Sequence, residues 1–254
     1  MAAHLDTIRK LVDIARLPGG LSAFARMRVR TASSLIAVLR LRACGLSPRR
    51  ILDIGANKGQ FVASCRAVFP EAAVIALEPI PALAEQLAGI FRDDPLVTAV
   101  CAAVGSQRET RHFEINEYSP SSSFLPLNEA HRQSFPEASA TRSEEMTILP
   151  LDELMAERDI APCDLIKIDV QGFEMEVLKG AAAALDAAQH AVIECSLSPL
   201  YEGEATLPDI CAFLRDRGFE SVGAVHILSS PQTGLVLQID LLFSRAGEVF
   251  SPAV

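Results

Sequence analysis

The chain has 254 residues, half of them hydrophobic, with 32 acidic and 23 basic side chains and a net charge of −9. This length and composition can bury a large core, most simply in one enlarged α/β domain. No apolar run reaches about 18 residues and no signal-peptide pattern opens the chain, so we expect neither a membrane span nor a secretory signal, and a cytoplasmic location. The six cysteines form no C-x-x-C pair, which favours reduced thiols.

Charge is unevenly distributed. Residues 1–50 contain ten basic and two acidic side chains, a net charge of +8, so the remainder must carry −17. We predict a helical extension over residues 1–48, with a break at 18–20 and a second apolar stretch at 35–41. Its arginines could face anionic lipid or an anionic substrate, or lie at the rim of a cap packed on the acidic body. The apolar positions at helical spacing in its first helix are Leu5, Ile8, Leu11, Val12 and Ala15.

Residues 50–60 predict a strand, a glycine turn and the start of a helix. An apolar strand carries Asp53 near its end and runs into a turn that contains Gly55 and Gly59, before a helix opens at Gln60. Glycines remove Cβ atoms where the backbone turns sharply and where a ligand approaches it. The pattern D-x-G-x-N-x-G is not the dinucleotide fingerprint G-x-G-x-x-G. S-adenosylmethionine brings an amino cation and a sulfonium instead of a pyrophosphate, and Asp53 suits that cation.

A second acidic residue supports a nucleoside-containing ligand. The apolar run 73–77 reads as the next strand and ends in Glu78 and Pro79. A carboxylate at the end of the second strand can accept both hydrogen bonds of a ribose diol and repels a 2′-phosphate. The alternative for Glu78 is a solvated carboxylate at the end of a strand.

The middle of the chain predicts a long insertion. A helix over 81–91 and a strand over 96–100 are followed by some sixty residues before the next strongly apolar strand. This interval contains strand-like runs at 110–115 and 146–149 and a serine-rich turn at 119–123. Long insertions in α/β domains are usually functional or disordered, and we interpret residues 106–148 as a substrate lid. The serines could equally close local turns.

Two further strands deliver carboxylates to the edge of the sheet where open α/β folds bind ligands. The strand 164–169 ends in Asp169, and the strand 191–196 carries Glu194. The two carboxylates could bind a divalent metal, Mg²⁺ or Mn²⁺, or accept a proton from a hydroxyl. Between them Glu174 begins a helix predicted over 175–183, where it could contact the substrate or only cap the helix.

Taken together, these segments resemble the FkbM family of S-adenosylmethionine-dependent O-methyltransferases over roughly residues 50–245. The resemblance implies a Rossmann-like class I methyltransferase: a doubly wound, mostly parallel sheet in a domain over 49–246, with an N-terminal helical extension and a lid insertion. Gln171 departs from the pattern, because many members carry Glu there. The blocks that carry the resemblance are 53–60 (DIGANKGQ), 77–79 (LEP), 102–105 (AAVG), 121–123 (SSS), 151–154 (LDEL), 164–174 (DLIKIDVQGFE) and 177–181 (VLKGA).

The implied reaction is methyl transfer to a hydroxyl of a small molecule or glycan, of sugar or polyketide type, catalysed mainly by aligning the reactants. The expected base or metal ligand is Asp169, then Glu194, with His131 of the lid as a third candidate base. The positions expected to bind the cofactor are Asp53, Gly55, Asn57, Gly59, Glu78, Pro79 and Ala102. Those expected near the acceptor are Ser121, Ser122, Ser123 and Glu174.

Other classes stay open. An NAD-dependent oxidoreductase would also use a strand, a turn and a downstream Glu, although the third fingerprint glycine is absent. A non-catalytic protein could keep the cofactor turn and lose the chemistry. Nucleic acid is disfavoured as a partner because the acidic body repels phosphates. We also expect a homo-oligomer.

Overall fold

The computed structural model describes residues 2–116, 122–126, 128, 141–230 and 233–247. Its centre is a seven-stranded sheet in the order β3-β2-β1-β7-β8-β10-β9. All neighbours pair in parallel except β10, which is antiparallel to both β8 and β9. The predicted doubly wound, mostly parallel sheet is therefore confirmed. In sheet order, the strands are Val97–Cys101, Ala73–Glu78, Arg50–Ile54, Leu165–Ile168, His190–Ser196, Val236–Arg245 and Phe219–Ser229.

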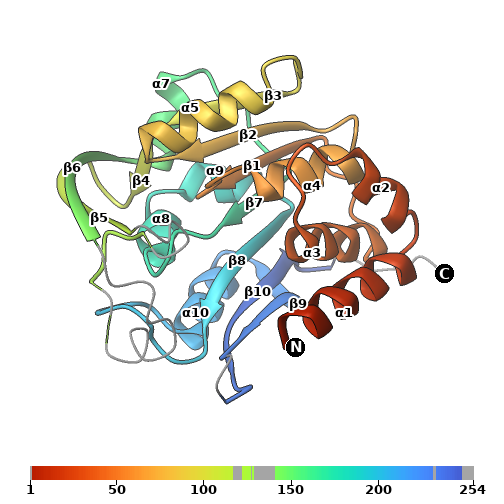
Figure 1. Cartoon of the computed structure of the whole chain (residues 1–254). Helices are drawn as coiled ribbons and strands as arrows, with labels where there is room; N and C mark the ends of the chain where they lie inside the picture. Colours follow the sequence, from red (N-terminus) through yellow and green to blue (C-terminus); the bar gives the residue numbers. More distant parts are fainter. Residues whose placement is uncertain (1, 117–121, 127, 129–140, 231–232, 248–254) are drawn as a thin grey trace.

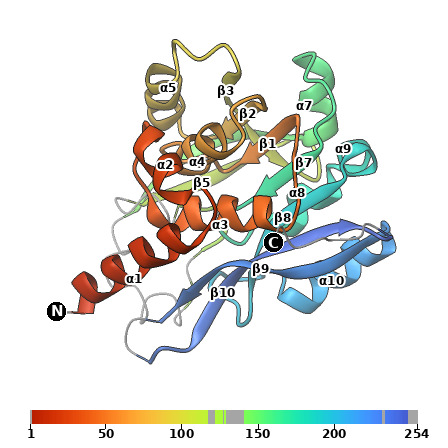
Figure 2. The same cartoon turned by 90° about the vertical axis from the view of Figure 1, so that its right-hand side faces the viewer.

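Helices cover both faces of this sheet (Figures 1 and 2). One buried cluster joins α3, α4 and α5 to one face, and a second joins α7, α8, α9 and α10 to the other. Each face is apolar because side chains alternate along every strand, and both faces of a parallel sheet are buried. The helices are α1 Ala2–Arg16, α2 Gly20–Arg26, α3 Ala32–Ala43, α4 Gln60–Val68, α5 Pro81–Ile90, α7 Leu151–Glu157, α8 Glu174–Lys179, α9 Ala182–Ala187 and α10 Leu207–Asp216.

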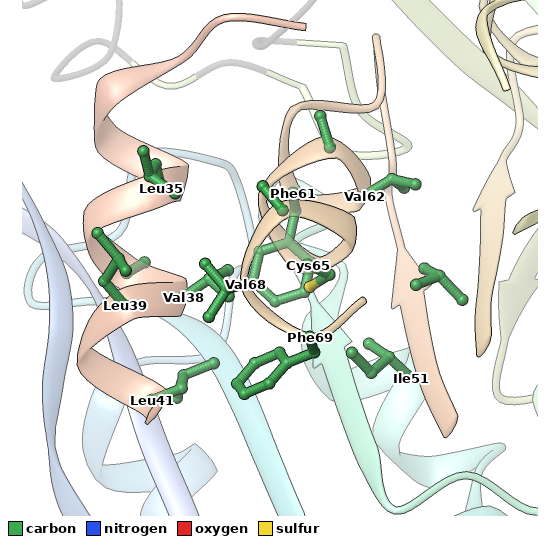
Figure 3. Packing of buried hydrophobic residues seen from close by; sticks show 14 of the residues in the cluster. Leu35, Val38, Leu39, Leu41, Ile51, Phe61, Val62, Cys65, Val68 and Phe69 are labelled. Carbon is green, nitrogen blue, oxygen red and sulfur yellow. The ribbon is translucent and has the colours of Figure 1, made fainter. Parts of the chain in front are cut away.

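The third helix of the N-terminal segment belongs to the core. Figure 3 shows Val38 of α3 beside Val68 of α4, and Leu35, Leu39 and Phe61 belong to the same buried cluster. The apolar pattern and the 18–20 break predict two or three helices in the N-terminal extension, and it contains three, α1, α2 and α3. Its last helix is held by the same apolar burial that holds the sheet.

The predicted insertion forms a small second sheet in the order β4-β6-β5. The strands β5 (Glu109–Asn116) and β6 (Thr141–Pro150) pair antiparallel, and β4 (Ala103–Gly105) pairs in parallel with β6. The two strand-like runs of the insertion are thus confirmed. Ser121 and His131 lie outside the described residues, as does the stretch 129–140, and a lid role for this insertion stays a prediction.

The helix predicted over 175–183 is two helices, α8 and α9, which meet at Gly180 and Ala181. A Cβ on Gly180 would lie 1.9 Å from the carbonyl oxygen of Gly105. This close approach of β4 to the helix explains why a glycine stands at the break, since any side chain would push the two segments apart.

Candidate active site

The turn between β1 and α4 has the conformation that its glycines suggest. Gly55 and Gly59 have φ of +83° and +79°, and Asn57 has φ of +49°. These angles lie in the left-handed region that favours glycine and is tolerated by asparagine. A Cβ on Gly55 would lie 1.9 Å from the carbonyl oxygen of Asp169. In this structure Gly55 therefore lets the end of β7 approach the turn.

Glu78 links the end of β2 to the same turn. One carboxylate oxygen accepts a hydrogen bond from the Asn57 amide (2.8 Å) and the other accepts one from the Ile80 amide (2.9 Å). Its side chain is buried, and burial raises the pKa of this carboxyl to about 7. Because each oxygen has a second lone pair, the carboxylate is fixed in place and can still accept from a ligand diol.

Charged and polar side chains on five neighbouring strands form a row across the sheet, which we call the polar row: Asp53 (β1), Lys167 (β7), Glu194 (β8), Asp240 (β10) and His226 (β9). The strand register pairs Asp53 with Lys167, and Asp240 with both Glu194 and His226. On four of these strands, the residue two positions away belongs to the buried cluster that joins α3, α4 and α5 to the sheet. These residues are Ile51, Leu165, Val192 and Leu242. Since side chains alternate in strands, the polar row lies on the face that α3 covers.

Lys167 is the buried cation of the row. Its ammonium lies 3.3 Å from an oxygen of Asp53 and 3.1 Å from an oxygen of Asp169. Burial alone would lower the pKa of Lys167, but Asp169 and Asp53 together raise it, so the lysine stays charged. Asp53 is fully buried, and apart from this ion pair neither of its oxygens has a hydrogen-bond partner. Its predicted contact with a cofactor cation is untested, and a cation of the protein already lies beside it.

Gln171 connects the two carboxylates predicted to act together. Its side-chain amide nitrogen donates to Asp169 (2.9 Å) and to Glu194 (3.0 Å), and its amide oxygen accepts from the Tyr201 hydroxyl (2.8 Å). The Tyr201 contact fixes which end of the amide faces the carboxylates. Asp169 and Glu194 are therefore brought together as predicted, with an amide hydrogen-bonded to both.

The two carboxylates differ in charge state. Burial alone would raise the pKa of Asp169, but Lys167 and the Gln171 amide hold it below its usual range, so Asp169 is ionised at neutral pH. Burial and the neighbouring Asp169 charge raise the pKa of Glu194 well above its usual range. Like charges in one site separate their pKa values in this way. In the described part of the chain, no group of three or more His, Cys, Asp or Glu side chains could hold a metal ion.

Glu174 is buried within its own loop. One oxygen accepts hydrogen bonds from the main-chain amides of Val170 (2.8 Å) and Gly172 (3.2 Å), and burial raises its pKa to about 8. These bonds close the turn that leads into α8. They go to amides before the helix, whose N-cap Phe173 has no side-chain cap bond, so Glu174 does not cap α8 as the sequence alternative suggested. A substrate contact for Glu174 stays a prediction.

The two described serines of the predicted acceptor set close turns. The Ser122 hydroxyl accepts from the Asn116 amide (2.9 Å), and the Ser123 hydroxyl donates to the main-chain carbonyl of Gln171 (2.6 Å). Ser122 also lines the cavity described next. Ser123 instead ties the insertion to the loop that carries Gln171, which positions that loop indirectly.

One cavity of about 330 Å³ joins these groups, a volume at the lower end of the range for small-molecule sites. Its first half is formed by the cofactor turn and the end of β2, with Gly55, Asn57, Glu78, Pro79 and Ala102 among its walls. Its second half is formed by the polar row, apart from the fully buried Asp53, and by the start of α3. The lining residues of this second half include Thr31, Ser33, Ser34, Glu194, His226, Leu228, Gln238 and Asp240.

The second half contains residues that the sequence analysis did not select. The His226 imidazole nitrogen Nδ1 lies 3.7 Å from a carboxylate oxygen of Asp240, and the Gln238 amide donates to Glu194 (3.0 Å). Burial and the Asp169 charge raise the pKa of Asp240. A sequence signal did exist for Lys167, because a lysine interrupts an otherwise apolar strand. His226 and Asp240 gave no such signal.

Comparison with known proteins identifies the family. The sequence model of the methyltransferase FkbM domain matches residues 53–221. The chain belongs to the FkbM methyltransferase family. A curated relative, methyltransferase sdnD of Sordaria araneosa, is 26% identical over 194 residues, which cover 67% of this chain and 73% of the relative.

Solved methyltransferase structures have a similar overall shape at low identity. The O-methyltransferase TomG from Streptomyces achromogenes, in complex with SAM, aligns with a TM-score of 0.46 and 14% identity, covering 86% of this chain and 82% of that one. The N-terminal domain of EvdMO1 with SAH bound aligns with a TM-score of 0.48 and 11% identity, covering 84% and 81%.

The two halves of the cavity differ in how many of their residues lie within the family match. The residues of the first half, from Gly55 to Ala102, lie inside the matched range 53–221. In the second half, Lys167 and Glu194 also lie inside it. The start of α3 precedes the match, and the four cavity residues on β9 and β10 follow it: His226, Leu228, Gln238 and Asp240.

Proposed function

We propose that the protein transfers the methyl group of S-adenosylmethionine to a hydroxyl of a small molecule or glycan that carries no negative charge. The observation that carries this proposal is a single cavity in which the cofactor turn and Glu78 form one half and the polar row forms the other. Membership of a methyltransferase family supports the reaction class.

The residues of the first half fit the cofactor. Glu78 presents a fixed carboxylate with free lone pairs, which suits a ribose diol. Ile80 and Ala102 give the same region apolar walls, which suits a purine ring. When bound, S-adenosylmethionine supplies an electrophilic methyl group on a sulfonium. An acidic cavity favours such a cation over the pyrophosphate of NAD.

The charges of the second half favour an uncharged acceptor. Among the described residues, four carboxyl groups line the cavity, Glu78, Asp169, Glu194 and Asp240, against one lysine. Lys167 is buried and already paired with two carboxylates, so no free lysine or arginine of the described lining remains for an anionic acceptor. Carboxylate, amide and imidazole groups together can hold several hydroxyls.

Two groups can remove the hydroxyl proton. Asp169 is ionised and lies at the border of the two halves, where it can orient the attacking oxygen. Its lowered pKa makes it a weak base, however, and bases work best when their pKa lies near the operating pH. His226 lines the second half of the cavity, which we call the acceptor half. Asp240 beside the Nδ1 of His226 would stabilise the imidazolium that forms. His226 is thus an added candidate beside Asp169.

Titration calorimetry with S-adenosylhomocysteine and with NAD tests the cofactor. We expect the first to bind and the second to give no heat; the reverse would return the protein to the oxidoreductase class. Transfer of labelled methyl from S-adenosylmethionine then tests the acceptor, with neutral methyl glycosides as probes and the corresponding sugar phosphates and uronic acids as matched anionic probes. Methylation of the anionic probes alone would contradict the acceptor class and leave the cofactor assignment intact.

A further inference from the structure

The first helix turns its apolar face to solvent. On α1, Ile8, Leu11 and Val12 are 58%, 40% and 42% exposed, while Ile14 on the opposite side is completely buried in the core cluster. The spacing i, i+3, i+4 places the three exposed residues on one stripe, and the exposed Ala15 continues it by one turn. The stripe that the sequence predicts as an apolar helix face is therefore left without a partner inside the described chain.

A further exposed apolar side chain lies on the neighbouring helix. Leu21 at the start of α2, which packs on α1, is 62% exposed. Single exposed apolar residues are ordinary, but a helix usually buries its apolar face, and a continuous exposed stripe marks an interaction site. Figures 1 and 2 both place α1 at the outside of the molecule, next to the chain terminus.

Basic side chains flank the stripe. Arg9 and Arg16 are both exposed on α1, and at about 100° per residue both lie at the same edge of the stripe. Arg26 on α2 donates to the main-chain carbonyl of Ala67, and no carboxylate of the described residues forms an ion pair with it. The stripe thus lies in the segment of net charge +8, against −17 in the rest of the chain.

An apolar stripe edged by arginines fits an anionic lipid surface better than a second copy of the chain. A symmetric dimer through α1 with antiparallel helices would bring Arg9 and Arg16 of the two copies to the same edge, with mutual repulsion. At a lipid surface the apolar face enters the headgroup boundary while the arginines meet lipid phosphates. The acidic body is repelled by the same surface, which orients the protein with α1 inward.

We propose that α1 docks the protein on anionic lipid surfaces through Ile8, Leu11 and Val12, with Arg9 and Arg16 as its electrostatic contacts. None of the helices in the described part of the chain is long and apolar enough to cross a bilayer, so the contact is peripheral. α1 packs on α3, and the start of α3 lines the cavity. Docking therefore holds the cavity near the surface, whatever acceptor it takes.

Flotation of the full chain with vesicles of phosphatidylcholine, with and without phosphatidylserine, tests the proposal. We expect binding only with phosphatidylserine present, and loss of that binding at high salt because surface charges are screened. Leu11→Asp should weaken binding by about tenfold or more, since it removes a buried leucine from the contact. Arg9→Glu and Arg16→Glu should each weaken it by about fivefold.

Matched variants act as controls. Leu197→Asp makes the same change at a leucine of similar exposure, 46%, that follows β8. Arg158→Glu reverses an exposed charge at the end of α7, on the opposite side of the molecule in both views. Both should bind vesicles like the unmodified protein, and all variants should keep its melting temperature and its affinity for S-adenosylhomocysteine.

Two results would overturn the proposal. The first is that phosphatidylserine vesicles do not bind the protein, or bind Leu11→Asp as well as the unmodified chain. The second is a protein that is dimeric by light scattering, becomes monomeric in Leu11→Asp and ignores vesicles. That outcome would make the stripe an interface between copies.

Discussion

The first half of the cavity, or cofactor half, and the second half, or acceptor half, are built in different ways. In the cofactor half, a turn of a few consecutive residues donates the Asn57 amide to Glu78 at the end of the next strand, and the Ile80 amide just after that strand donates to the same carboxylate. In the acceptor half, side chains from four strands and the start of α3 meet only because the sheet places them side by side. The first half is a local motif, whereas the second is a product of sheet register. Changes in the first should disturb folding and cofactor affinity, and changes in the second should disturb turnover.

The largest effect is expected at the cofactor turn. Gly55→Ala places a Cβ 1.9 Å from the Asp169 carbonyl oxygen, whereas Gly203, also at positive φ, has nothing within 4 Å of its added Cβ. Gly203→Ala should lower the free energy of unfolding by only about 1 kcal/mol, from left-handed strain. Gly55→Ala should lower it by about 3 kcal/mol or more, because β1 and β7 must separate. Urea denaturation of both variants measures this, and equal losses would show that the turn tolerates the separation.

The second largest effect is expected on turnover, from changes in the acceptor half. Asp169→Asn keeps the shape but leaves Lys167 with one carboxylate fewer, so turnover on a confirmed acceptor should fall by about 10² or more while the affinity for S-adenosylhomocysteine changes little. His226→Gln, measured beside it, separates the two candidate bases. If His226 is the base, turnover at saturating S-adenosylmethionine should fall at least as far in His226→Gln as in Asp169→Asn. Full activity in both variants would leave catalysis to positioning alone.

A smaller, selective effect is expected at Glu78. Glu78→Ala removes the acceptor of two main-chain amides and of the proposed ribose diol, so cofactor affinity should fall by about 1.5 to 3 kcal/mol. Calorimetry measures the affinity, and circular dichroism checks that the fold survives. The change should leave the relative rates on different acceptors unaltered, since the acceptor half is untouched. Unchanged affinity would return Glu78 to the alternative of a structural carboxylate.

The smallest effect is a pH dependence of cofactor affinity. The pKa of Glu78 is raised to about 7, mainly by burial and partly by the Asp53 charge, against the two amide hydrogen bonds and Lys167. A protonated carboxyl cannot accept from both ribose hydroxyls, so affinity should fall as pH drops below about 7, by about tenfold at one unit below. In Glu78→Gln the same titration should be flat. A slope that persists in this variant would assign the dependence to another group.

The raised pKa values also determine whether the stability of the fold rises or falls with pH. A carboxyl whose pKa rises on folding binds its proton more tightly in the native state, so its contribution is present at low pH and is lost as pH rises. For Glu174 the window runs from about 4.5 to about 8. The melting temperature of the free protein should decline across this range, and less so in Glu174→Gln, whose side chain keeps an oxygen for the Val170 amide.

The sequence by itself determined the features that depend on neighbouring residues. The turn 55–59, the strand ends that carry Glu78 and Asp169, and the helical character of the N-terminal segment follow from local periodicity, glycine placement and apolar runs. The family resemblance implied a doubly wound, mostly parallel sheet, without an order for its strands. The pairing of Asp169 with Glu194 followed from the rule that such strands end at one edge.

Tertiary structure decided the features that depend on strand register in the sheet and on which face of a helix packs inward. His226 and Asp240 stand on long antiparallel strands after residue 196, where the sequence analysis placed no elements, and only their pairing brings them to Glu194. The amide of Gln171 came to lie between two carboxylates through a left-handed turn and a tyrosine thirty residues away. Periodicity showed that α1 has an apolar face, but not that the other face packs inward. That choice depends on which side buries more surface against α3, a comparison between segments that no local pattern contains.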